Sequence, residues 1–141
     1  MTTPASLPRV AIEPVDEGYV PGVCNIGSWE IRRRWVGGIL GLAAAAVLLA
    51  LLVAVHAPAA ARVLVLLPAW GGAFSVLQAR RRFCGAYAMR RISNFGVTYD
   101  TIQTVADEAA HRADMAKLAG MLRDSFVIGL VITVVAVLLP L

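Results

Sequence analysis

The chain has 141 residues, 59% of them hydrophobic, and a formal net charge of +4. Soluble domains contain about 45–50% apolar residues, so this composition excludes an ordinary water-soluble fold. The excess lies in three long uncharged runs flanked by arginines, where anionic lipid headgroups rather than nucleic acid are the natural partner. We therefore expect an all-α integral membrane protein: a transmembrane helical hairpin plus a long amphipathic cytoplasmic helix that runs into a third membrane helix.

Residues 1–34 form a polar, proline-rich tail that ends in a basic flank. Its recurring prolines and glycines oppose a helix and favour extended, polyproline-like chain, with disorder as the alternative. No apolar run precedes Trp35, so the segment lacks the pattern of a secretory signal peptide. We expect the tail to stay in the cytoplasm.

Residues 35–79 are predicted to form the hairpin. The run 35–55 is uncharged and matches the ~20 residues that a membrane-crossing helix needs, and Trp35 stands where an interfacial tryptophan is expected. The run 63–79 is predicted to be the second crossing. Pro58 suits the turn between the two helices, and Pro68 suits a kink near the start of the second.

The rest of the chain divides into three predicted segments. Residues 80–97 are basic with interleaved aromatic residues and should lie at the membrane interface. Residues 98–124 have helical periodicity, with Thr98 or Asp100 as the N-cap. Residues 125–141 are long enough for a third crossing, with a re-entrant helix as the alternative. The periodicity places Ile102, Val105, Ala109, Ala113 and Ala116 on one face, and Asp107, His111 and Asp114 on a second, solvated face.

The placement of lysine and arginine predicts the orientation. Of 13 such residues, all but Arg62 lie before Trp35 or between Arg80 and Arg123. The positive-inside rule puts those two regions in the cytoplasm and the loop with Arg62 outside. We expect a multi-pass protein of a bacterial-type inner (plasma) membrane, with a cytoplasmic N-terminus and an external C-terminus.

Two features predict contacts with lipid or with other helices. Two arginine triplets should present their guanidinium groups near one membrane face, as a site for lipid headgroups or an acidic partner. Gly37 and Gly41 form a small-xxx-small pattern that lets a second helix approach closely, within the chain or from a partner. The triplets are Arg32, Arg33 and Arg34, and Arg80, Arg81 and Arg82.

Cysteines and histidines supply the other candidate site residues. Cys24 and Cys84 are a possible thiol site, because nearby arginines favour a thiolate; two unrelated reduced cysteines are the alternative. Glu108 and His111 form one E-x-x-H motif, whereas a di-iron bundle needs two, and His56 could ligate a haem-like group. These are weak metal candidates. We predict no metal site, and the sequence does not name a cofactor.

The opening of the first helix resembles the YgaP-like inner-membrane domain family. The resemblance rests on CNIGSWE from Cys24 to Glu30 with Arg34 and Gly38 after it, and on FCGAY from Phe83 to Tyr87. It covers about residues 24–92. It implies a two-helix hairpin with both ends cytoplasmic. Some members carry a fused rhodanese sulfurtransferase domain, which this chain lacks, so sulfur transfer does not carry over.

These observations lead to three hypotheses about function. The chain contains no complete catalytic constellation, so we expect no enzyme but a small accessory or scaffold subunit of a larger membrane protein complex. It would contact partner helices, or a second copy of itself, and anionic lipid at the cytoplasmic face. The alternative is a membrane thiol or sulfane-sulfur handling protein that uses Cys84 with Cys24. A small transporter is a third reading, disfavoured because the apolar runs carry no charge.

Overall fold

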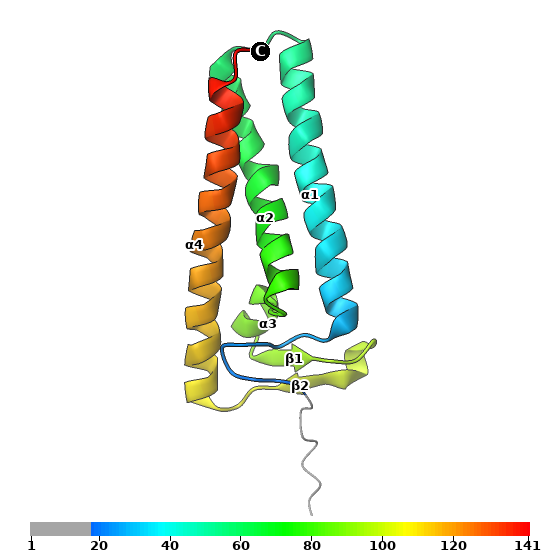
Figure 1. Cartoon of the computed structure of the whole chain (residues 1–141). Coiled ribbons are helices and arrows are strands. Elements are labelled where there is room, and N and C mark those ends of the chain that lie inside the picture. The colour runs from blue at the N-terminus through cyan, green and yellow to red at the C-terminus, as the bar shows by residue number, and fades with distance from the viewer. Residues whose placement is uncertain (1–17) are drawn as a thin grey trace, which may run out of the picture.

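The protein is a bundle of three long helices with a small sheet at one end (Figure 1). The structure, a computed structural model, describes residues 18–141, so most of the predicted proline-rich tail, residues 1–17, lies outside the described part. The elements are α1 (Ser28–Ala54), the 3-10 helix η1 (Ala59–Val65), α2 (Leu66–Arg80), α3 (Gly85–Met89), β1 (Ile92–Asn94), the 3-10 turn η2 (Tyr99–Thr101), β2 (Ile102–Thr104) and α4 (Glu108–Leu138).

The three helical segments Ser28–Ala54, Ala59–Arg80 and Glu108–Leu138 are long and apolar enough to cross a membrane, by length and composition. The mostly helical class and the three apolar helices predicted from sequence are therefore confirmed. Helix α1 begins seven residues before the predicted start at Trp35, so the first arginine triplet lies inside it. Pro68 falls in the first turn of α2, where a missing backbone N–H is tolerated.

Helix α2 is the central helix, because α1 and α4 both pack against it. Glycines bring α1 and α2 together: a Cβ on Gly72 would lie 2.7 Å from the Leu42 nitrogen, and one on Gly41 would lie 2.7 Å from the Gly72 Cα. Gly38 is also buried at this contact, whereas Gly37 is exposed. The predicted glycine contact is therefore intramolecular: Gly38 is buried beside Gly41, and a Cβ on Gly37 would lie 3.1 Å from the Ser75 Oγ of α2.

The contact between α2 and α4 is centred on Trp70. Its indole N–H donates to the Ser125 hydroxyl at 3.2 Å, and its ring meets Phe126 edge to face, with centroids 5.3 Å apart. Gly129 makes room for it, because a Cβ there would lie 2.9 Å from the Trp70 Cα. A polar indole edge that is partly buried between helices needs such a partner, and Ser125 supplies it.

Arg62 closes the end of the bundle that lies opposite the sheet. Its side chain is buried and donates to the backbone oxygens of Ala136 (3.1 Å), Leu139 (2.9 Å) and Leu141 (2.8 Å). The last carbonyl groups of a helix have no partner within the helix and carry partial negative charge. Arg62, the one basic residue of η1, therefore caps the C-terminal end of α4.

Helix α4 differs from the helix predicted over 98–124 in its start and in its buried face. It begins at Glu108 and runs unbroken through the third apolar run; its N-cap is Asp107, whose carboxylate accepts from the Ala109 and Ala110 nitrogens. Residues 98–107 instead supply η2 and the strand β2, which pairs antiparallel with β1. The predicted apolar face was wrong: the buried positions of its first turns are Ala110, Asp114, Leu118, Met121 and Ser125.

Two adjacent glycines of α2 test the packing against α1. Gly72→Ala should destabilise the bundle by about 1–3 kcal/mol, because the new methyl group overlaps the α1 backbone. Gly71→Ala is the matched control: a Cβ at Gly71 meets nothing within 4 Å, and alanine is the better helix former. Thermal unfolding in detergent measures both. Equal melting temperatures for the two variants would contradict the helix contact described here.

Candidate functional site

The sheet end of the bundle, hereafter the basic end, is joined to the N-terminal segment by an isolated β-bridge. Ile26 forms a parallel bridge with Asn94 of β1; the Asn94 nitrogen donates to Asn25 O at 3.0 Å, and the Gly27 nitrogen donates to Asn94 O at 2.9 Å. Glycine is required at position 27, because a Cβ there would lie 2.6 Å from the Phe95 oxygen. The Asn-Ile-Gly motif thus joins the start of α1 to the sheet.

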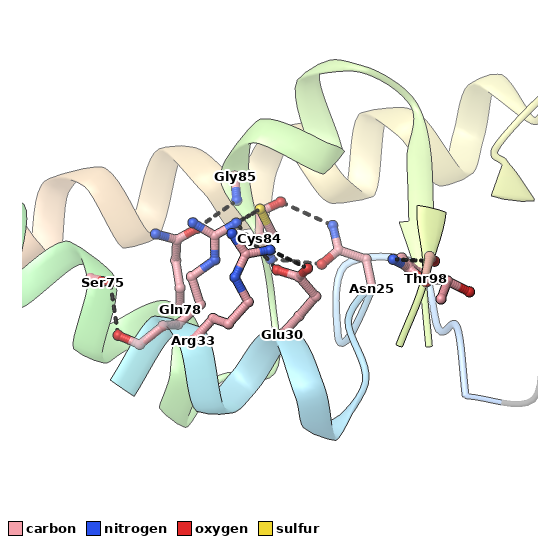
Figure 2. Close-up of polar contacts among 10 residues, drawn as sticks. Asn25, Glu30, Arg33, Ser75, Gln78, Cys84, Gly85 and Thr98 are labelled. Carbon is pink, nitrogen blue, oxygen red and sulfur yellow. Dashed lines mark hydrogen bonds and ion pairs between the residues drawn. The ribbon is translucent and has the colours of Figure 1, made fainter. Parts of the chain in front are cut away.

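The side chain of Asn25 holds the loop that follows α2 (Figure 2). Its carboxamide oxygen accepts from the Cys84 nitrogen at 2.7 Å, and its carboxamide nitrogen donates to the Cys84 oxygen at 3.0 Å. The Asn25 nitrogen also donates to Arg82 O at 3.1 Å. Asn25 and Cys84 are both fully buried, so their paired groups replace the water that a loop backbone would otherwise bind. Asn25 therefore fixes the end of α2 relative to the start of α1.

Cys84 lies fully buried inside this network, and its sulfur contacts Arg34. The Arg34 Nη2 donates to the Cys84 Sγ at 2.9 Å, and the Gln78 side-chain oxygen accepts from the Gly85 nitrogen at 3.1 Å (Figure 2). Cys24 is half-buried, and its thiol donates to the Gly18 oxygen at 2.7 Å. Both cysteines are free, and each sulfur has its own partner.

Glu30 is a buried acid that the arginines of its own helix neutralise. Its carboxylate is 3.1 Å from the Arg33 Nη1 and 3.7 Å from the Arg34 Nη2, and the residue is 3% exposed. Tyr87 of α3 lies beside it. Burial raises the pKa of the Tyr87 phenol above its ordinary value, and the negative charge of Glu30 raises it further. The phenol therefore stays protonated at neutral pH.

Asp114 is the second buried acid, and its role was not foreseen. Its carboxylate accepts from the Tyr19 hydroxyl at 2.9 Å and from the Gly22 nitrogen at 2.7 Å. The prediction of a solvated face through Asp114 is therefore wrong, because the carboxylate turns inward to hold the segment before α1. No pattern in the sequence indicates this contact, since its partners are more than ninety residues away.

The six arginines of the two triplets divide into an inner set, which pairs with acids, and an outer set, which does not; Arg33 belongs to the inner set by its pairing, although its side chain is 55% exposed. Arg33 and Arg34 pair with Glu30, and Arg81 pairs with Asp124 of α4 at 2.7 Å. The other three, Arg32, Arg80 and Arg82, are exposed, and within residues 18–141 they form no ion pair. Those three line one groove between the start of α1 and the end of α2, with a volume of about 570 Å³. The structure thus brings the two triplets together.

The three weak metal candidates have different surroundings. His56 is exposed just after α1, Glu108 forms an ion pair with Arg91 at 2.9 Å, and the His111 Nδ1 is buried with no hydrogen-bond partner within the described chain. Among residues 18–141, no group of three or more histidine, cysteine, aspartate or glutamate side chains is placed to hold a metal ion.

Comparisons with protein-family models, curated proteins and solved structures found no match to this chain. The resemblance to the YgaP-like inner-membrane domain therefore stays a prediction. The residues that carry it nevertheless have defined places: the Asn-Ile-Gly motif makes the bridge to β1, and Phe83 and Cys84 are buried in the loop after α2.

Replacing Asn25 tests the network at the basic end. Asn25→Ala should lower the free energy of unfolding by about 1–3 kcal/mol, because it leaves the buried N–H of Cys84 without a partner and leaves the Cys84 oxygen with only the Ala88 nitrogen as donor. Asn25→Asp should destabilise as well, since a carboxylate oxygen would then face the Cys84 oxygen in a buried site. Ser28→Ala, at an exposed neighbour that makes no capping bond, is the control. An Asn25→Ala protein as stable as this control would refute the role of the carboxamide.

Proposed function

We propose that this chain is a small non-catalytic accessory or scaffold subunit of a larger membrane protein complex. In this proposal its three apolar helices span an inner (plasma) membrane, and its outer surface contacts partner helices and anionic lipid. The observation that carries the proposal is the outward face of α1. Leu40, Val47 and Leu51 on this face are each about 60% exposed, and no other described part of the chain covers them.

A groove on that face supports contact with a helix of another protein. Trp29, Arg33 and Leu40 line it, and the exposed Gly37 lies among them. Packing between membrane helices depends on small residues that let two backbones approach, because lipid tails are as apolar as leucine. Gly37 is exposed at this groove, although a Cβ on it would also lie 3.1 Å from the Ser75 Oγ of α2.

The buried polar side chains support a structural rather than a catalytic role. Hydrogen bonds within the chain engage the side chains of Asn25, Gln78 and Asp114. Such networks hold a shape that other proteins can recognise. They leave the outer surface as the part of the molecule available for function.

The distribution of charge supports a cytoplasmic basic end. Among the described residues, Arg62 is the one lysine or arginine at the opposite end of the bundle, and its charge is buried on carbonyl groups. Lysine and arginine near membrane helices favour the cytoplasmic side. We propose that the N-terminal segment faces the cytoplasm and that the C-terminal end of α4 faces outward.

Co-purification tests the proposal. The tagged full chain, expressed in its source cells and extracted in mild detergent, should elute with one or more defined membrane proteins. Leu40→Trp should reduce their yield about tenfold, because the larger side chain fills the groove. Leu67→Trp, at a similarly exposed leucine of α2 outside the groove, should not. A wild-type chain that elutes alone as a monomer, with no chemical cross-link to another protein in intact membranes, contradicts the proposal.

One contact favours the thiol or sulfane-sulfur reading as a second candidate. The Arg34 guanidinium lies 2.9 Å from the Cys84 sulfur, and a neighbouring positive charge stabilises a thiolate. Against it, Cys84 has no exposed surface, so a reagent reaches it only when the basic end opens.

Alkylation rates decide this candidate. If Cys84 handles sulfur, the folded protein should react with a small alkylating agent faster than the same protein unfolded in denaturant, and Arg34→Gln should abolish the difference. Cys84→Ser identifies the signal that belongs to this residue, with Cys24 as the internal reference. If Cys84 reacts only after unfolding, the hypothesis of a sulfur-handling protein is contradicted.

A further inference from the structure

The groove between the start of α1 and the end of α2 combines three cationic side chains with an apolar wall. Arg32, Arg80 and Arg82 come from the two triplets, and Trp35, Val36 and Ile39 continue along α1 toward the middle of the bundle. The lining of the groove is therefore cationic at the basic end of the bundle and apolar farther along α1. This is the polarity of a phospholipid that lies with its headgroup at the basic end.

The charges in this groove are not needed by the fold. Each acid near the triplets pairs with an inner arginine: Glu30 with Arg33 and Arg34, and Asp124 with Arg81. The three groove arginines have no acidic partner within the described residues. Like charges held close together without a counter-ion repel one another. An anion bound in the groove would relieve this repulsion, because no acid of the described chain does so.

Backbone strain at Arg82 is a second, independent observation. Arg82 follows the end of α2 with a φ of +52°, and the nitrogens of Arg82 and Phe83 donate back to Ala79 and Gln78. That is the pattern of a helix C-terminus in which glycine normally occupies the left-handed position. An arginine there is strained, and such strain is retained where the side chain has a use. Because Arg82 lines the groove, its position indicates a use in binding a ligand there.

We propose that this groove binds one anionic phospholipid, with the phosphate between the guanidinium groups of Arg32, Arg80 and Arg82 and an acyl chain along Trp35, Val36 and Ile39. The inference rests on the membrane placement proposed above, and it adds the ligand class and the site. Guanidinium groups pair with phosphate oxygens through charge-assisted hydrogen bonds, which are stronger than neutral ones. A free phosphate ion satisfies the arginines but leaves the apolar wall uncovered.

Native mass spectrometry of the full chain measures the binding. The delipidated protein in mild detergent is titrated with phosphatidylglycerol and, separately, with phosphatidylcholine of the same acyl chains. The first should bind at least tenfold more tightly, and its affinity should fall as ionic strength rises. Phosphatidylglycerol with brominated chains should quench the fluorescence of the wild type more than that of Trp35→Phe, because Trp35 lines the groove.

The variant Arg82→Gly separates a binding role from a structural one. It should lower the affinity for phosphatidylglycerol about fivefold, which corresponds to the roughly 1 kcal/mol that one arginine contributes at an anionic surface. The same change should raise the melting temperature of the lipid-free protein by a few degrees, because glycine relieves the left-handed strain. Arg32→Gln with Arg80→Gln should lower the affinity further.

Arg91→Gly is the matched control. Arg91 also follows a short helix with a positive φ, of +54°, but it pairs with Glu108 and does not line the groove. Its replacement removes the same charge and the same strain and should leave lipid affinity unchanged. Equal affinity for the two lipids, an equal loss in Arg82→Gly and Arg91→Gly, or displacement of the lipid by inorganic phosphate alone would each overturn the proposal. None of these results would affect the co-purification of a partner protein.

Discussion

The paired hydrogen bonds between the Asn25 carboxamide and the backbone of Cys84 are the interaction on which the basic end depends. They join three parts of the chain that are distant in sequence: the segment before α1, the loop after α2 and, through the bridge at Asn94, the sheet. Because the carboxamide donates and accepts at once, one residue satisfies a buried N–H and a buried C=O that water cannot reach. The two arginine triplets lie side by side as a consequence.

Three buried charged side chains of the described chain each have polar partners within it. Glu30 is neutralised by two arginines of its own helix, Asp114 accepts from the segment before α1, and Arg62 donates to the last carbonyl groups of α4. Each charge would be costly in an apolar environment without these partners. Asp114 and Arg62 also tie the two ends of α4 to other parts of the chain, while glycine contacts and Trp70 define how the helices pack.

The arginine triplets have two roles that the structure separates. The inner arginines belong to the fold, since their partners are buried or helix-bridging acids. The outer arginines face a groove that continues into apolar surface, and one of them occupies a strained backbone position. This division supports an account in which the helices and the buried network provide a rigid frame, and the surface of α1 provides the contacts with lipid and partner proteins.

The three apolar helices could be predicted from sequence because each is a long uncharged run, and length and hydropathy are local properties. The contact at Gly41 could be predicted as well, because small-residue spacing is local. The start of α4 could not: periodicity extended the helix back to Thr98, but residues 102–104 are taken into a strand by pairing with β1. The buried face was missed because Asp114, a residue that usually faces water, is turned inward by Tyr19 and Gly22.

The sequence by itself therefore determined the helical class, the three apolar segments and the clustering of basic residues. Only the tertiary structure decided which arginines pair with acids and which remain free, and where Cys84 lies. It also showed that Arg62 caps the C-terminal end of α4. The physical reason is that these outcomes depend on partners far away along the chain. A side chain's hydrogen bonds and ion pairs are set by what the fold brings beside it, and its neighbours in sequence carry no record of them.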